Sequence, residues 1–171
     1  MSRSIYVDSA LHVVKGALVS VLRIPTGRTT TTVQNNATAK TATATGASTV
    51  TTHGGSITVA SVAAFEKSQE KKIQEAVDEK VAENAPYHIY RMDRKEAEQL
   101  YGETMYDQFP VPDSVTSLRL CRLPGWNLNC QVNPVLQHTG LLGKVTLTKF
   151  TYNADKKTLK VTIDCVPIPG E

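Results

Sequence analysis

The sequence predicts an α+β domain, a two-layer sandwich with helices on one face of a mainly antiparallel sheet. Strand patterns come in runs separated by helices of unequal length, rather than in strict alternation with them. The chain has 171 residues, of which 40% are hydrophobic and 20% charged, so it can bury a core without disulfides. It shows no internal repeat. We therefore expect a single domain over residues 1–171.

The first predicted element is an apolar helix, with Asp8 or Ser9 as its N-cap and Ile24-Pro25 at its end. Apolar residues lie on most of its faces, which is typical of a buried helix. The apolar stretch 10–22 is too short to span a bilayer and lacks a cleavage pattern after it. These features predict a soluble protein without a membrane partner.

Residues 29–52 form a Thr/Ala-rich insertion in which Lys40 is the only full charge. Threonine favours extended chain, but no apolar alternation runs through the segment. We expect a long hairpin tip or a disordered insertion without a catalytic role, and a functional lid is the alternative.

The remaining helices and strands are predicted from hydrophobic periodicity, helix-capping residues and turn residues. A helix opened by Asp93 and closed by Gly102 has Glu96 three residues after its cap. The other predicted elements are a helix over 66–84 and strands over 56–62, 87–91, 117–123, 145–152 and 158–165.

The net charge and the cysteine content exclude few classes of function. A formal net charge of +3 is too small to indicate a nucleic-acid binder by itself. The three cysteines, Cys121, Cys130 and Cys165, are odd in number and widely spaced, which disfavours a disulfide framework and favours a reducing, cytoplasmic location.

Asp8 and His12 form the first candidate constellation. They are four residues apart, so on a helix both side chains lie on one face, close enough to share a ligand. A histidine simply held by the aspartate is the alternative.

Several collinear motifs carry a resemblance to a known family. In order they are Ser9-Ala-Leu-His-Val-Val-Lys-Gly16, His53-Gly-Gly-Ser-Ile-Thr-Val59, Glu96-Ala-Glu98, Met105-Tyr-Asp107, Trp126-Asn-Leu-Asn129, Thr139-Gly140 and Gly143. Together they resemble the freestanding alanyl-tRNA editing proteins, which are similar to the second additional (editing) domain of alanyl- and threonyl-tRNA synthetases. The likeness covers most of residues 5–28 and 53–152.

The resemblance implies hydrolysis of the ester that joins serine or glycine to the tRNA for alanine. It also implies zinc, held by an HxxxH motif on the first helix and a CxxxH motif later in the chain. In this sequence those four positions fall on Asp8, His12, Gln131 and Val135. One of the four ligands is kept, so the sequence departs from ordinary zinc-dependent editing.

Two hypotheses address this departure. Asp8, His12, Cys130 and His138 would form a rearranged zinc site if a bulge shifted the chain near Cys130. The plain alternatives are that Cys130 is a small buried hydrophobe and His138 an exposed loop residue. Without zinc, His12 would act as the general base for water and Asp8 would orient it, since aminoacyl esters are already activated.

Four further residues are candidates for substrate binding. The resemblance places Thr26 near a hydroxyl that helps to distinguish serine from alanine, Gly54 and Gly55 permit close backbone approach, and His53 is a candidate pocket group. Turn and hairpin geometry alone would also explain Thr26 and the two glycines.

The partner implied by the resemblance is tRNA, and a synthetase is a second candidate partner. Basic side chains that could reach tRNA phosphates, or merely form a solvated surface, are Lys15, Arg91, Arg94, Lys144 and Lys149. The function predicted first is an editing-type hydrolase with an altered or lost zinc site. The alternative is an inactive tRNA-binding or protein-interaction module on the same fold.

Overall fold

Two antiparallel sheets and the helices packed on them make up the structure, a computed structural model that describes residues 4–25, 31–43, 49–107 and 111–167. In chain order the elements are α1 (Ile5–Leu22), β1 (Thr31–Thr43), β2 (Thr49–Val59), α2 (Lys67–Ala82), β3 (His88–Asp93), α3 (Arg94–Tyr101), β4 (Ser117–Leu123), β5 (Asn127–Cys130), the 3-10 helix η1 (Thr139–Leu142), β6 (Lys144–Asn153) and β7 (Thr158–Val166).

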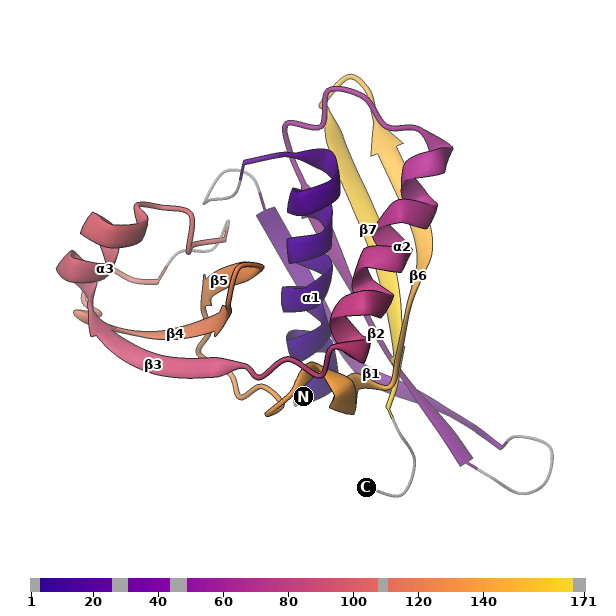
Figure 1. Ribbon diagram of the computed structural model, residues 1–171, viewed down its shortest axis with the longest axis horizontal. Helices are drawn as coiled ribbons and strands as arrows, with labels where there is room; N and C mark the ends of the chain where they lie inside the picture. Colours follow the sequence, from indigo (N-terminus) through magenta and orange to yellow (C-terminus); the bar gives the residue numbers. More distant parts are fainter. Residues whose placement is uncertain (1–3, 26–30, 44–48, 108–110, 168–171) are drawn as a thin grey trace.

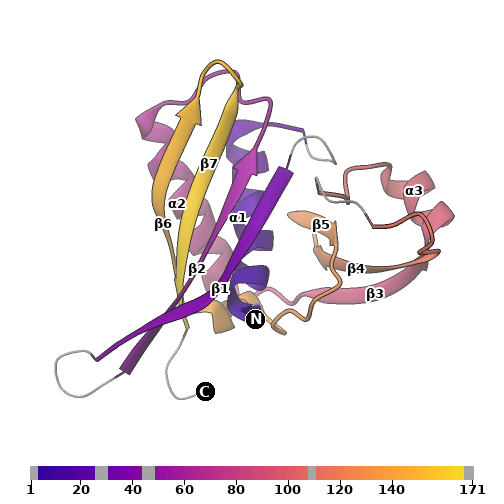
Figure 2. The same cartoon turned by 180° about the vertical axis from the view of Figure 1, so that it is seen from behind.

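The larger sheet has the strand order β1-β2-β7-β6, and α1 and α2 lie side by side on one of its faces (Figures 1 and 2). This arrangement confirms the predicted α+β class with helices on one sheet face. A separate sheet of order β3-β4-β5 lies on the other side of α1, with α3 at its far end (Figure 1). The division of the strands between two sheets was not part of the prediction.

Helix α1 begins earlier than predicted. Ser4 is its N-cap, and the Ser4 hydroxyl accepts a hydrogen bond from the Val7 amide at 3.3 Å. Asp8 and Ser9, the predicted caps, are therefore inside the helix and buried. With 18 residues α1 is long and apolar enough to cross a membrane, but 67% of it is buried inside the fold. Its apolar faces contact both neighbouring sheets and α2, as expected of a core helix.

Two glycines allow α1 to pack closely. A Cβ on Gly16 would lie 2.2 Å from the Trp126 ring, and one on Gly55 would lie 2.5 Å from Cγ1 of Val7. Both distances are far below contact distance, so only glycine fits at either position.

The described part of the Thr/Ala-rich insertion forms a hairpin, which is one of the two forms expected for it. β1 pairs with β2 from Thr31 opposite Val59 to Thr43 opposite Thr49, with one register shift between Asn36 and Lys40. β2 pairs with β7 only from His53 onward. The outer part of the hairpin therefore extends beyond the sheet as a two-stranded arm (Figure 1). Residues 44–48 lie outside the described residues.

The smaller sheet has its own apolar cluster, formed by Ala97, Met105, Tyr106, Leu118 and Leu120. α3 is capped by Asp93 and Gly102, as predicted. Strand β5 was missed because it has only four residues and two of them are asparagine, a residue depleted in strands.

Candidate functional site

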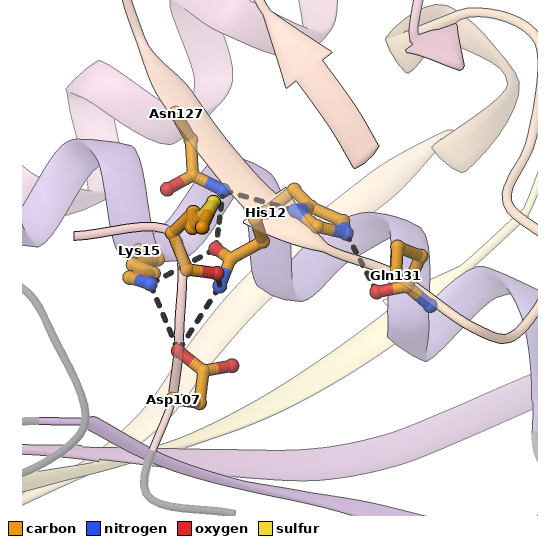
Figure 3. A network of polar contacts seen from close by, with 7 residues as sticks. His12, Lys15, Asp107, Asn127 and Gln131 are labelled. Atoms are coloured by element: carbon orange, nitrogen blue, oxygen red, sulfur yellow. Dashed lines mark hydrogen bonds and ion pairs between the residues drawn. The ribbon is translucent and has the colours of Figure 1, made fainter. Parts of the chain in front are cut away.

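A polar pocket of about 290 Å³ opens where α1 meets the end of β5. Both elements contribute buried polar side chains. Buried polar groups in folded proteins are stable when they have hydrogen-bond partners. Figure 3 shows the contacts within it. The lining residues are Asp8, Leu11, His12, Lys15, Val33, Asp107, Asn129, Cys130, Gln131, Val132 and Asn133.

The imidazole of His12 is held at both ring nitrogens. Its Nε2 lies 2.9 Å from Oε1 of Gln131, and its Nδ1 lies 2.9 Å from Nδ2 of Asn127 (Figure 3). An amide oxygen can only accept and an amide nitrogen can only donate. With these amide orientations, Nε2 carries the proton and Nδ1 accepts, so the ring is neutral.

Burial favours the same neutral form. Desolvation lowers the pKa of His12 from 6.5 to about 4, against the opposing effect of the hydrogen bond to Gln131. His12 is therefore uncharged at neutral pH, and it is a weaker base than a free histidine.

A second part of the network surrounds Lys15, whose side chain is only 2% exposed. Its Nζ donates to Oδ1 of Asp107 and to Oδ1 of Asn129, each at 2.9 Å. Asn129 also accepts from Asn127 at 3.0 Å and donates to Asp107 at 3.1 Å. One connected set of hydrogen bonds thus runs from Asp107 to His12 (Figure 3).

The predicted dyad of Asp8 and His12 needs correction. Asp8 lies on the same helix face and lines the same pocket, as the spacing predicted. Both ring nitrogens of His12 are already taken by Asn127 and Gln131, so Asp8 does not orient the ring. The charge of its carboxylate is the smallest of the influences that raise the pKa of His12.

The residues present do not fit a zinc ion. Asp8, His12 and Cys130 line the pocket, but both ring nitrogens of His12 are hydrogen-bonded to amide side chains. His138 is not among the lining residues and instead forms a bridge with Pro86 at the start of η1. Within the described ranges, no three His, Cys, Asp or Glu side chains are grouped to hold a metal.

Gln131 is the residue whose side chain contacts Nε2 of His12. It falls where the resemblance places a cysteine ligand, and its contact with His12 shows that this position does reach the expected histidine. Here a hydrogen bond joins the two positions. Val135, at the remaining ligand position, is an aliphatic residue packed against the main core.

The expected substrate-binding residues lie elsewhere. His53 is 2.9 Å from the Ser4 hydroxyl and packs on the Tyr6 ring at the start of α1, and partial burial lowers its pKa. Gly55 is buried against Val7. Neither these two residues nor Gly54 is among those lining the pocket. Thr26 lies outside the described residues.

The sequence prediction assigned no role in the site to the amide side chains of Asn127 and Asn129. A signal for them was present, because residues 127, 129 and 131 are spaced by two, which puts their side chains on one face of an extended chain.

Some of the basic residues expected at tRNA phosphates are engaged in contacts within the protein, and others are exposed. Lys15 is buried in the network and cannot reach a phosphate on the surface. Arg94 donates to the carbonyl oxygens of three residues in the segment 111–115, and Lys144 pairs with Asp78. Arg91 and Lys149 are exposed.

Comparison with known proteins relates part of the chain to a larger enzyme. No protein-family model matches the chain. Alanine–tRNA ligase of Thermofilum pendens (strain DSM 2475 / Hrk 5) is 31% identical to it over 87 residues. Those residues are 51% of this chain and 9% of the ligase. Over about half its length, the chain is thus related to a small part of an alanyl-tRNA synthetase.

Proposed function

We propose that the chain is an editing-type hydrolase domain, which cleaves serine or glycine from the tRNA for alanine at a site with no zinc bound in the family manner. The observation that carries the proposal is the polar pocket built around His12 and Lys15. The relation to an alanine–tRNA ligase supports it. In this proposal tRNA is the partner, a synthetase is a candidate second partner, and the location is cytoplasmic.

The size and polarity of the pocket suit a small aminoacyl group. Its volume of about 290 Å³ lies at the lower end of the range for small-molecule sites. The carboxylates of Asp8 and Asp107 complement the α-ammonium group that every aminoacyl ester carries. The amide of Asn133, also in the lining, offers hydrogen bonds to a serine hydroxyl.

Lys15 supplies the positive charge that such a reaction needs. In ester hydrolysis water adds to the carbonyl carbon, negative charge develops on the carbonyl oxygen, and the ribose hydroxyl then leaves. An ammonium group held rigidly by Asp107 and Asn129 stabilises this charge without reorganising. His12 can take part only when Asn127 releases its Nδ1 atom. This nitrogen would then accept the proton of the attacking water and pass it to the ribose oxygen as the ester bond breaks.

Deacylation of charged tRNA tests the proposal. Serine-charged and glycine-charged tRNA for alanine should lose their amino acid faster than the alanine-charged control. Asp8→Ala, His12→Ala and Lys15→Met should each slow the reaction about tenfold or more. His88→Ala, on the exposed side of β3, is the matched control and should leave the rate unchanged. Unchanged rates in all three pocket variants would exclude this site.

An inactive module that binds tRNA or a protein is the second candidate. The observation that favours it is the engagement of both His12 nitrogens, together with the replacement of the ligands that the resemblance implies. The same assay separates the two candidates. Absence of hydrolysis combined with salt-sensitive tRNA binding would favour the inactive module.

A further inference from the structure

A second and larger cavity adjoins the polar pocket. Its volume is about 490 Å³, and it shares Asp107, Cys130 and Val132 with the pocket. It lies along the first residues of β4 and the segment that precedes this strand. A ligand with one end in the pocket could therefore extend into this cavity without leaving the protein surface.

Two arginines form one wall of the cavity. Arg91 on β3 is directly opposite Arg119 on β4, so both side chains project from the same sheet face. Like charges placed opposite each other across a sheet are destabilising. An anion between them would remove this repulsion, because guanidinium groups bind phosphate and carboxylate oxygens in pairs.

The two arginines differ in what holds them. Arg119 donates to the backbone oxygens of Gln131 and Asn133, which fixes its guanidinium beside the loop that carries Gln131. Arg91 is exposed and has no hydrogen-bond or ion-pair partner in the described part of the chain. One guanidinium is thus preorganised, and the other is available to a ligand.

Part of the remaining wall is apolar and is formed by Val111, Pro112, Val115 and Leu118. The polar side chains of Asp107 and Ser117 also line the cavity. Val132, at the rim shared with the polar pocket, is 79% exposed, which is unusual for a large aliphatic side chain. The cavity therefore offers both an anion site and a surface for a flat or apolar group.

We propose that this cavity binds a nucleoside monophosphate unit, with its phosphate between Arg91 and Arg119 and its sugar or base against the aliphatic wall. This identification rests on the proposed function, in which the unit belongs to the 3′ end of the RNA that carries the aminoacyl group. The pocket would then hold the amino acid and the cavity the nucleotide next to it.

Calorimetric titration of the full chain with adenosine 5′-monophosphate tests this assignment, and adenosine and inorganic phosphate serve as comparison probes. The monophosphate should bind about tenfold or more tightly than adenosine, because a charge-assisted contact is lost without the phosphate. Arg91→Gln should weaken its binding by a similar factor. Arg122→Gln is the matched control, since Arg122 is an exposed arginine on the neighbouring strand β4 and lines neither cavity.

Amide chemical shifts locate the ligand. With the wild type, the monophosphate should move signals of residues 111–118 and 130–133. Equal affinity for monophosphate and adenosine, no binding at millimolar concentration, or no effect of Arg91→Gln would each overturn the assignment. Tight binding of inorganic phosphate alone would mean a simple anion site and would also overturn it.

The outcome is separable from that of the proposed function. Monophosphate binding that depends on Arg91 in a chain that does not deacylate tRNA would reject the hydrolase and keep the nucleotide site. Deacylation that is unaffected by Arg91→Gln, at subsaturating tRNA, would keep the hydrolase and reject the nucleotide site.

Discussion

The Nε2 atom of His12 lies 2.9 Å from Oε1 of Gln131, although the two residues are 119 positions apart in the chain. The contact joins the buried helix α1 to the segment that follows β5. It places a neutral amide on the imidazole at the point where the resemblance implies a metal-bound cysteine. The site is therefore organised by hydrogen bonds among side chains.

Metal removal should have no effect on the protein. The purified chain should contain less than stoichiometric zinc, and a chelator should leave its melting temperature unchanged, because the grouped side chains do not form a ligand set. Elemental analysis and thermal unfolding measure this. One zinc per chain that resists dialysis would contradict it.

A zinc site should be installable at the same place. Asp8→His combined with Gln131→Cys would present two histidines one helical turn apart and a thiolate at the position that contacts His12. We expect stoichiometric zinc in this double variant. The single variant Asp8→His, which keeps the hydrogen bond to Gln131, is the control and should not retain the metal.

Acid should destabilise the fold through His12. The pKa of His12 is about 4 in the folded protein and near 6.5 when unfolded, so between these values the unfolded state takes up the proton first. The contribution of neutral His12 to the free energy of unfolding is therefore lost as pH falls from 6.5 toward 4. The loss is on the order of 2 kcal/mol by pH 4.5. Urea unfolding at pH 7 and pH 4.5 should show a smaller difference for His12→Gln than for the wild type. The control His88→Gln should keep the wild-type difference.

The ion pair of Lys15 and Asp107 should respond unequally to the loss of its two partners. Lys15 is 2% exposed, so Asp107→Ala strands a buried charge and should cost about 3 kcal/mol of unfolding free energy. Lys15→Met fills the same space and leaves Asp107, whose side chain is 24% exposed, to be hydrated. Lys15→Met should therefore lower the free energy of unfolding by less than Asp107→Ala does. Chemical denaturation measures both, and the opposite order would refute this account.

The outer arm of the β1–β2 hairpin should be dispensable for folding. Replacing residues 41–51 with Asn-Gly keeps the pairing of Lys40 with Thr52 and the whole of the β2–β7 ladder. The free energy of unfolding should change by about 1 kcal/mol or less. Deacylation should also persist. Its loss in a variant that still folds would favour a functional lid.

Most elements were predictable because their signals are local. The cap residues Asp93 and Gly102 bound α3 as expected, and the strand over 117–123 was predicted to the residue. The start of α1 was predicted too late because Asp8 and Ser9 are good caps in isolation. Ser4 caps the helix instead, and residues 5–7 then join α1, with Val7 buried against the sheet.

By itself the sequence determined the α+β class, the order of the main elements, and the shared helix face of Asp8 and His12. It also carried the relation of about half the chain to an alanyl-tRNA synthetase. Only the tertiary structure decided that Asn127 and Gln131 hold His12 and that Lys15 is buried against Asp107. Hydrophobic periodicity and helix-capping residues act over a few positions of the chain. Contacts between distant residues depend instead on how the helix packs against the sheets and where each strand ends.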